Sequence, residues 1–224
     1  LKQKSEPQGL IKISCPSVMM HFQIRTLLNQ FLKDYPKVQI ELELTSRRVD
    51  LIHDDIDLAI RTNFQANEDS SLIVRDVIKT THCLVASPEL LKGRHIQHFT
   101  ELHEFPSVVL GMQKSQYYWH LNNREHGEVI DIPLQPRIKS NDLAGVYYAV
   151  CDGFGIADLP YLAVEQDIKQ GKLIHVLPEW CSNLGTVQLV YASRKGQRLV
   201  MEKLIDYLVE GLRDLAKDHS GYAL

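Results

Sequence analysis

The sequence has 224 residues, of which 44% are hydrophobic and 24% charged, a composition typical of a globular protein with a sizeable core. A formal net charge of −3 means that the chain lacks the positive field that dominates nucleic-acid binding, so we expect it to bind DNA poorly by itself. Four widely spaced cysteines argue against a disulfide framework or a zinc knuckle, and no apolar run is long enough to cross a bilayer.

The first elements follow a strand, helix, strand order. Residues 1–8 are polar and are expected to be the end of a linker from an upstream module. A strand is predicted over 10–15, after which Pro16 and Ser17 supply a breaker and a helix N-cap. The following helix, with apolar residues three and four apart from Ile24 to Tyr35, is stopped by Pro36.

The next segments complete a repeating pattern. Residues 38–44 alternate between apolar and polar side chains, which predicts a strand with one solvated face. We expect a short helix over 49–52 and a third strand over 56–61. This β-α-β-α-β order predicts a parallel sheet with right-handed crossovers.

A second series of elements follows. Strands are predicted over 72–79, 82–86, 107–110 and 187–191, with a glycine-flanked strand start at 153–157, and residues 137–140 precede a predicted helix. Helices are predicted over 141–151, from Pro160 to Gly171, and at the C-terminal end. The terminal helix should bury one apolar face, formed by Leu204, Ile205, Leu208, Leu212 and Leu215.

Two α/β lobes with a central cleft fit this order better than one sheet. We expect lobe I to contain residues 9–80 and 186–215, lobe II to contain 81–185, and 216–224 to be a tail. The chain would cross between the lobes near Thr80-Thr81 and return near Leu184-Gly185. Open α/β sheets bind ligands at the carboxyl ends of their strands, so the expected site is the cleft.

Across residues 9 to about 212 the sequence resembles the regulatory domain of LysR-type transcriptional regulators. The order and spacing of several short stretches carry the resemblance, namely Gly9–Ser14, Phe31-x-x-x-Tyr35-Pro36-x-Val38-x-Ile40-Glu41-Leu42, Val49–Ile52, Asp57–Arg61, Leu84–Pro88, Ser140-Asn141, Gly153–Pro160 and Gly171–Pro178. It implies a two-lobe fold like that of type 2 periplasmic binding proteins. It also implies an upstream winged helix-turn-helix, absent here, that contacts promoter DNA.

A cytoplasmic location is the default expectation, because the sequence has no apolar run of membrane-spanning length and its first residues lack the apolar core of a signal peptide. The resemblance further implies a homodimer or tetramer. The family's domains pair side by side in antiparallel fashion, which here would involve the helix over 24–35 and the strand over 38–44.

Candidate effector contacts in lobe I follow the ends of its strands. Pro16 and Ser17 follow the first strand, and Ser17 would cap the helix, bind a ligand, or do both. Thr45 and Ser46 follow the second strand and suit a small polar ligand or a solvated turn. Arg61, followed by Thr62, would hold a carboxylate or form a structural salt bridge to Asp57 or Asp76. The family often has glycine where Asn63 stands here.

Candidate contacts in lobe II are Thr80, Thr81, Ser140, Asn141, Phe154 and Gly155. Ser140 and Asn141 begin a helix whose free amides favour anions, and we expect them to be the main contacts from this lobe. Gly153-Phe154-Gly155 lacks the third glycine of a dinucleotide loop, so these glycines are expected to let the backbone approach the cleft.

Other residue clusters are expected to be structural. His95, His98 and His103 lack a metal-ligand spacing, and Asp54, Asp55 and Asp57 fit a solvated turn. We therefore expect no metal and no cofactor. Cys15, Cys83, Cys151 and Cys181 are expected to be buried reduced thiols, although a redox sensor using Cys15 or Cys83 stays open.

The sequence thus predicts the effector-binding and oligomerisation domain of a LysR-type regulator, whose small-molecule ligand modulates transcription. A periplasmic-type solute receptor of the same fold is the main alternative, and a thiol-based redox-sensing regulator of the same fold stays open. An enzyme comes third, because a fold does not dictate activity, but it is not expected because no catalytic constellation is visible.

Overall fold

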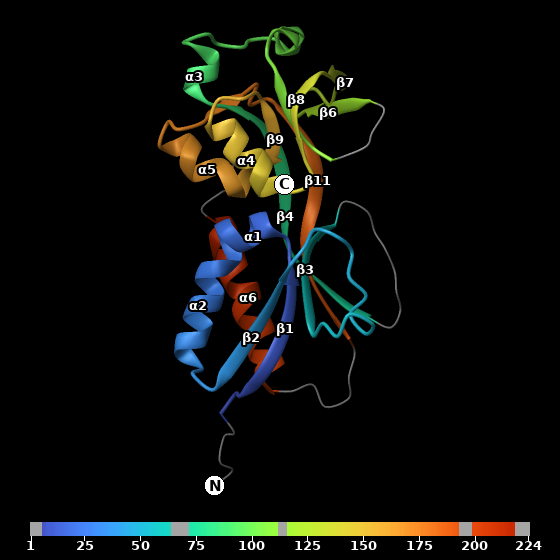
Figure 1. Ribbon diagram of the computed structural model, residues 1–224, viewed down its shortest axis with the longest axis vertical. Coiled ribbons are helices and arrows are strands. Elements are labelled where there is room, and N and C mark those ends of the chain that lie inside the picture. The colour runs from blue at the N-terminus through green and yellow to red at the C-terminus, as the bar shows by residue number, and fades with distance from the viewer. Residues whose placement is uncertain (1–5, 64–71, 112–115, 193–198, 218–224) are drawn as a thin grey trace. The chain divides into compact units, whose positions relative to one another are not determined.

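Figure 1 shows the computed structural model of the chain, which describes residues 6–63, 72–111, 116–192 and 199–217. The chain divides into two compact units. Unit 1 contains residues 1–79 and 185–224, and unit 2 contains residues 80–184. The boundaries fall within strands β4 (Leu72–Ala86) and β11 (Trp180–Ala192), so both strands contribute to both units.

The centre of unit 1 is a mixed sheet around β1 (Gly9–Cys15). β1 pairs in parallel with β2 (Val38–Leu44) and with β3 (Leu58–Asn63), and β11 pairs antiparallel with β3. The strand order is β2-β1-β3-β11-β4. Ile11 and Ile13 are fully buried at alternate positions of β1, which is the period of two that a pleated strand requires. The predicted parallel strands are therefore confirmed.

A continuous helical segment follows β1. It consists of α1 (Ser17–Met19), a π-helical turn (Met20–Ile24) and α2 (Arg25–Asp34). The prediction that Ser17 is the N-cap is wrong, because the helix begins at Ser17 and Pro16 occupies the cap position with extended dihedral angles. Proline suits the cap because it lacks the N–H that would go unpaired there.

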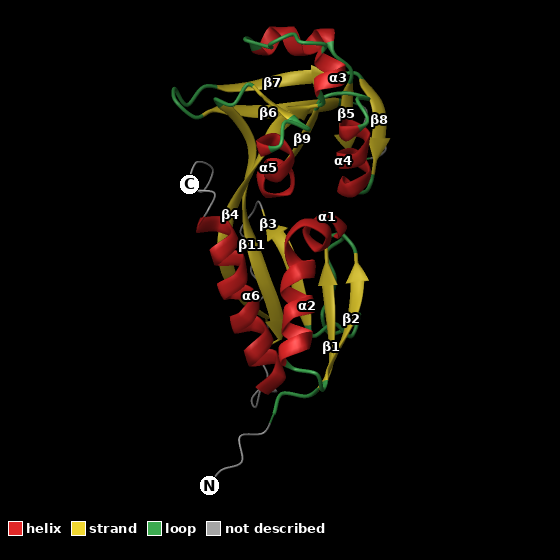
Figure 2. Ribbon diagram, turned by 90° about the vertical axis from the view of Figure 1, so that its left-hand side faces the viewer, coloured by secondary structure: helices red, strands yellow, loops and turns green. Residues whose placement is uncertain are grey.

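The C-terminal helix α6 (Leu199–Lys217) lies beside α2 on the same face of the unit 1 sheet (Figure 2). Phe31 of α2 is fully buried, and its ring centroid lies 5.4 Å from that of Tyr207 on α6. Most of the predicted apolar face of α6 is buried. Leu215 is the exception, with 37% of its surface exposed, because it lies in the last turn of the helix.

The expected short helix over 49–52 is wrong. This segment is a single turn, because the Asp50 carboxylate accepts hydrogen bonds from the backbone N–H groups of Ile52 and His53, both at 3.0 Å. Asp55 then adopts a left-handed φ of 54°, which ends any helical continuation. The two strands expected over 72–79 and 82–86 are the single strand β4.

Unit 2 has three groups of strands. In the first, β5 (Ser107–Leu110) pairs in parallel with β8 (Pro136–Ser140). In the second, β9 (Ala157–Pro160) and β10 (Ile174–Val176) pair with β4. The third is a hairpin of β6 (Tyr117–Asn123) and β7 (Val129–Leu134), whose strand β6 also pairs with the start of β11. Neither this hairpin nor β10 was predicted from the sequence.

Helices α4 (Leu143–Cys151) and α5 (Tyr161–Lys169) lie side by side in unit 2 and both contact β9 (Figure 1). Both were predicted, with slightly different ends. Unit 2 also contains α3 (Pro88–Leu91) and a 3-10 helix, Phe99–Glu104, which were not predicted. Its core combines the hairpin with buried side chains of β4, β10 and the start of β11, and includes Trp119 and Leu121 of β6 and Trp180 of β11.

Candidate functional site

A cavity of about 160 Å³ lies where the parallel strands of unit 1 end. The β1–β2 register places Cys15 opposite Leu44, and the β1–β3 register places Ser14 opposite Ala59, so the three strands deliver their following residues to one edge. The cavity is lined by Ser14, Pro16, Thr45, Ser46, Arg47, Arg48, Val49, Ala59, Ile60, Arg61 and Thr62.

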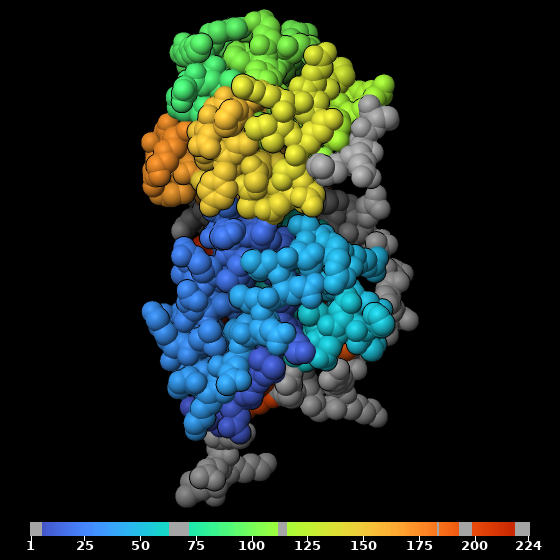
Figure 3. All heavy atoms as spheres, in the orientation of Figure 1, coloured from blue at the N-terminus to red at the C-terminus, as the bar shows by residue number. Residues whose placement is uncertain are grey.

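Local hydrogen bonds fix the loop that follows β2. The backbone N–H of Thr45 donates to the carbonyl of Cys15 at 3.0 Å, which ties the loop to the end of β1. The hydroxyl oxygen of Thr45 accepts from the backbone N–H of Arg47 at 3.2 Å, a turn of the kind that threonine favours. Most residues of the segment 45–57 lie at the surface of unit 1, where the segment appears light blue to cyan in Figure 3, whereas Leu51 and Ile56 are buried.

Three arginines give the cavity its positive charge, and Arg47 is neutralised within unit 1. Its guanidinium bonds Asp54 at 2.8 Å and Glu43 at 2.9 Å. These two carboxylates raise the pKa of Arg47, with the larger effect from Asp54. Neither Arg48 nor Arg61 forms an ion pair with an acidic side chain in the described parts of the chain. The net charge of the cavity wall therefore comes from Arg48 and Arg61.

Arg61 is held in place by an amide rather than by a carboxylate. Its Nε donates to Oε1 of Gln188 across the β3–β11 pair, at a long 3.4 Å, and Gln188 donates to Asp76 at 2.7 Å. Partial burial, and secondarily the charge of Arg48, lower the pKa of Arg61, although arginine stays protonated in proteins. The alternative of a direct salt bridge from Arg61 to Asp57 or Asp76 is therefore wrong.

The sequence-based candidates of unit 1 are distributed unevenly around this cavity. Pro16, Thr45, Ser46, Arg61 and Thr62 line it, whereas Ser17 is not among its lining residues. Their role as effector contacts stays a prediction. Six further lining residues were not predicted as contacts, namely Ser14, Arg47, Arg48, Val49, Ala59 and Ile60. The two arginines directly after Thr45-Ser46 were a usable signal, because they continue the same strand-end loop.

Two cavities have walls formed by described residues of unit 2. None of the sequence-based candidates of unit 2 lines either cavity. Thr80 and Thr81 are buried in β4, and the Thr81 hydroxyl donates to the carbonyl of Ser182 at 3.0 Å. The Ser140 hydroxyl bonds the backbone N–H and carbonyl of Asp142, which forms the turn before α4. Asn141 is exposed, and α4 begins two residues later than predicted. Contact of these residues with an effector stays a prediction.

The Gly153-Phe154-Gly155 segment has a packing role. A Cβ on Gly155 would lie 2.7 Å from the carbonyl oxygen of Pro106, which is closer than real Cβ contacts occur. Gly153 has a φ of +78°, a conformation that side chains disfavour. Phe154 is partly exposed, with the guanidinium of Arg137 5.1 Å from its ring centroid. The close approach required of Gly155 is thus to a neighbouring loop of unit 2.

The cysteines are free thiols. Cys15, Cys83 and Cys181 are buried, and Cys151 is partly buried. Burial raises the pKa of the Cys15 thiol to about 12 and raises the pKa values of Cys83 and Cys151 above the ordinary range. Because the thiolate is the reactive form, these surroundings disfavour redox chemistry at neutral pH.

The histidine and aspartate clusters have structural partners. His98 caps the 3-10 helix in a reciprocal capping box with Glu101, whose carboxylate accepts the backbone N–H of His98 at 2.9 Å. Asp55 bonds the Lys12 ammonium at 2.6 Å, and Asp57 accepts the backbone N–H of Lys12 at 3.0 Å. Within the described ranges, no three histidine, cysteine or acidic residues come together in a way that would hold a metal ion.

Comparison with known proteins identifies relatives along almost the whole chain. The model of the LysR substrate binding domain family matches residues 4–213. The chain is 26% identical over 210 residues to the HTH-type transcriptional regulator PtxR of Pseudomonas aeruginosa, covering 93% of this chain and 66% of PtxR. The chain thus spans slightly less than two thirds of that relative.

Solved structures show the same fold. The regulatory domain of AphB from Vibrio vulnificus is 28% identical, with a TM-score of 0.76 over 92% of this chain and 100% of that one. The regulatory domain of CrgA, a LysR-type transcriptional regulator from Neisseria meningitidis, is 27% identical, with a TM-score of 0.79 over 91% of this chain and 98% of that one. The expected α/β fold of the type 2 periplasmic-binding-protein kind is confirmed.

Among the helices that the structure describes, none is long and apolar enough to cross a membrane.

The family match, the relatives and the shared fold agree with one another, and the chain belongs to the LysR substrate binding domain family.

Proposed function

We propose that this chain is the effector-binding and oligomerisation domain of a LysR-type transcriptional regulator, and that its unit 1 cavity binds the acid group of a small organic anion, a carboxylate. One observation carries the proposal. Arg48 and Arg61 line a cavity at the carboxyl ends of three parallel strands, without acidic partners among the described residues, in a chain that matches a substrate-binding family.

The arrangement favours an anion for electrostatic reasons. The two guanidinium groups repel each other, since the charge of Arg48 lowers the pKa of Arg61, and a bound carboxylate would relieve that repulsion. A planar guanidinium also matches a carboxylate with two parallel hydrogen bonds. The hydroxyls of Thr45 and Ser46 would accept or donate further bonds. At about 160 Å³ the cavity is small, so it holds an acid group and a few more atoms.

Binding would control transcription through a change in the assembly. Couplings between two sites are typically about 1–3 kcal/mol, enough for a several-fold change in promoter occupancy. In unit 1 β2 is an edge strand, and its Leu42 and Leu44 are 38% and 47% exposed. An exposed edge of this kind supports pairing of two copies through β2 and α2. DNA contact would come from a helix-turn-helix elsewhere in the whole protein, which would act in the cytoplasm.

The ligand is tested with a thermal-shift screen of small carboxylates, including succinate, malate and benzoate, followed by calorimetric titration of the best binder. Losing a hydrogen bond to a charged group costs about 1.5–3 kcal/mol, so Arg61→Ala should weaken binding by about 10- to 150-fold. Arg48→Ala should also weaken it. Arg75→Ala serves as the matched control, because Arg75 pairs with Asp206 at an exposed position outside the cavity.

Unchanged affinity in both cavity variants would rule out this site. A shifted unfolding midpoint of the unliganded Arg61 variant would show a folding defect, and its affinity would then be taken from the folded fraction. The remaining candidate contacts, including Ser140 and Asn141, stay predictions that the same titrations test.

A periplasmic-type solute receptor is the alternative that shares this fold. The relatives named as HTH-type regulators favour the transcriptional function over it. The segment that precedes the chain in its reading frame distinguishes the two, because a regulator would carry a helix-turn-helix there and a receptor a signal peptide.

A further inference from the structure

Unit 2 contains a second and larger cavity, of about 690 Å³, that the proposed function does not use. Its walls come from the end of the 3-10 helix and the loop after it, the start of β5, the β6–β7 hairpin, and β8. All of these segments belong to unit 2. The volume lies in the range of about 300–1,000 Å³ that is usual for small-molecule sites.

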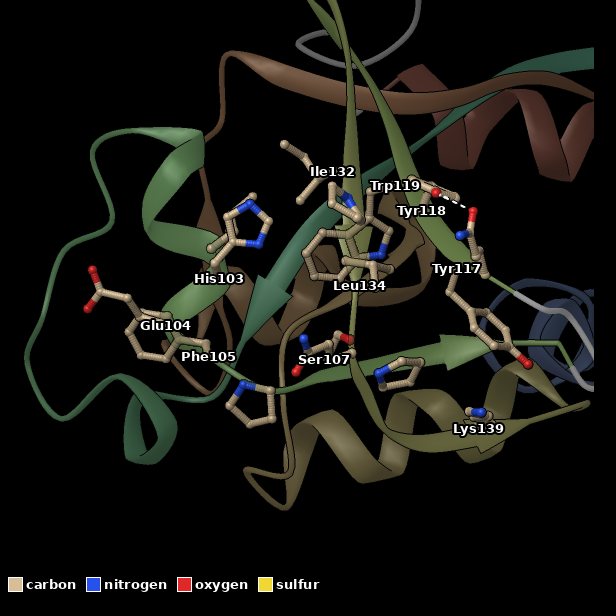
Figure 4. Close-up of a pocket in the computed structure, with 16 residues that line it drawn as sticks. His103, Glu104, Phe105, Ser107, Tyr117, Tyr118, Trp119, Ile132, Leu134 and Lys139 are labelled. Carbon is tan, nitrogen blue, oxygen red and sulfur yellow. Dashed lines mark hydrogen bonds between the residues drawn. The ribbon is translucent and has the colours of Figure 1, made fainter.

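The cavity has an apolar, largely aromatic side. Trp119, Ile132 and Leu102 line it and belong to the buried core of unit 2, and Phe105 and Leu134 pack against that core. In Figure 4 the Trp119, Ile132 and Leu134 side chains lie on one side of the cavity and Ser107 lies across from them. Rigid aromatic and branched side chains of this kind suit the flat face of a ring.

Ser107 gives this cavity an unsatisfied polar group. The residue is 3% exposed, and within the described residues its hydroxyl has no hydrogen-bond partner. Buried polar groups in native proteins are nearly always hydrogen-bonded, so an orphaned hydroxyl at a cavity wall indicates a missing partner. A ligand oxygen is a suitable partner, because a hydroxyl both donates and accepts.

The charge of the cavity is positive at one end. Lys139 lines it, and the Lys139 ammonium lies 4.9 Å from the ring centroid of Tyr117 without an ion pair to any described acidic side chain. At the other end the Glu104 carboxylate bonds Arg94 at 2.6 Å, which neutralises it. In Figure 4 Tyr117 and Lys139 lie at the end opposite Glu104.

We propose that this unit 2 cavity is a second ligand site, which binds a cyclic or aromatic organic anion. The ring would lie against Trp119 and Leu134, an oxygen of the ligand would bond the Ser107 hydroxyl, and the negative charge would face Lys139. This site shares no lining residue with the unit 1 cavity. A regulator with both sites would respond to two different small molecules.

The test is calorimetric titration of the whole chain with sodium 2-naphthoate, and with uncharged 2-naphthamide. Naphthoate should bind, and naphthamide should bind about tenfold more weakly because it loses the charge facing Lys139. Lys139→Met keeps the apolar stem and should weaken naphthoate about tenfold while leaving naphthamide unchanged. Lys203→Met, at an exposed position of α6, should change neither affinity.

Ser107→Ala adds an independent readout. Removing an unpaired hydroxyl should leave the unfolding midpoint of the unliganded protein unchanged or raise it, while naphthoate affinity falls about threefold or more. Arg61→Ala should leave naphthoate affinity unchanged, which separates this site from the proposed function.

The proposal is overturned if naphthoate does not bind up to millimolar concentration, or if its affinity is the same in the Ser107 and Lys139 variants. A loss of naphthoate binding in Arg61→Ala alone would overturn it as well, because that result would place the ligand in unit 1. A crystal structure of the naphthoate complex would decide between these positions directly.

Discussion

Gly155→Ala tests whether the glycine acts in packing, as the structure shows, or in ligand contact, as the sequence predicted. A Cβ at this position would lie 2.7 Å from the carbonyl oxygen of Pro106 and 3.0 Å from the carbonyl carbons of Pro106 and Ser107. All three atoms are backbone, so no side-chain rotation relieves the clash. Two hydrogen bonds of 2.9 Å, Ile156 N to Pro106 O and Val108 N to Ile156 O, hold the two segments together.

The expected cost follows from these contacts. Overpacking in a core typically costs about 1–3 kcal/mol, and a backbone clash belongs at the upper end. Alanine restrains the unfolded chain more than glycine does, which offsets about 0.4–1 kcal/mol of this loss of unfolding free energy. The net loss of unfolding free energy should therefore be about 2 kcal/mol. In a domain of this size that loss lowers the thermal midpoint by about 4–8 °C.

Urea denaturation followed by circular dichroism measures the loss. Gly171→Ala is the matched control, because Gly171 also lies in unit 2, has a φ of +72° and has open space around its Cβ position. The control should lose only about 1 kcal/mol, from backbone strain. The packing argument is refuted if Gly155→Ala is as stable as the native chain but binds the effector less tightly.

Two further predictions concern titratable groups. Burial raises the pKa of the Cys15 thiol to about 12 and also raises the pKa of Cys83. Ellman's reagent at pH 8 should therefore modify at most Cys151 rapidly in the native protein, and all four thiols after unfolding. Rapid modification of Cys15 in the native protein would contradict this. Burial, and secondarily the charge of Arg124, lower the pKa of His175 to about 4, which is below the unfolded value of 6.5. The contribution of His175 to the unfolding free energy is therefore present above pH 6.5 and is lost as the pH falls through 4. Relative to His175→Gln, the native chain should lose unfolding free energy over that range, and parallel pH profiles for the two proteins would refute the assignment.

Much of the fold could be predicted from hydrophobic periodicity. The strands β1, β2 and β5 and the helices α2, α4, α5 and α6 have patterns strong enough to locate within a few residues. The helix expected over 49–52 does not form, because the Asp50 side chain accepts backbone hydrogen bonds and closes a turn instead. A short apolar run in the sequence does not reveal that such side-chain hydrogen bonds compete with a helix. The β6–β7 hairpin was overlooked, although Tyr117, Trp119 and Leu121 are buried at alternate positions.

The candidate sites were predicted less completely. The rule that ligands bind at the carboxyl ends of parallel strands located five of the eleven residues that line the unit 1 cavity, because these strand ends meet at one edge. Thr81 was proposed because it lies at the expected crossover between the lobes, and the sequence did not reveal that its hydroxyl bonds the backbone of Ser182, 101 residues away. The unit 2 cavity is formed by four separate segments, so a single motif could not reveal it. Long-range partners of this kind are specified only by the folded structure.

The most direct test of the proposed function is a crystal structure of the chain with the carboxylate that binds most tightly in the screen. We predict that the acid group lies in the unit 1 cavity, with its oxygens about 2.7–2.9 Å from the Arg61 guanidinium. An effector bound elsewhere, with this cavity empty, would contradict it.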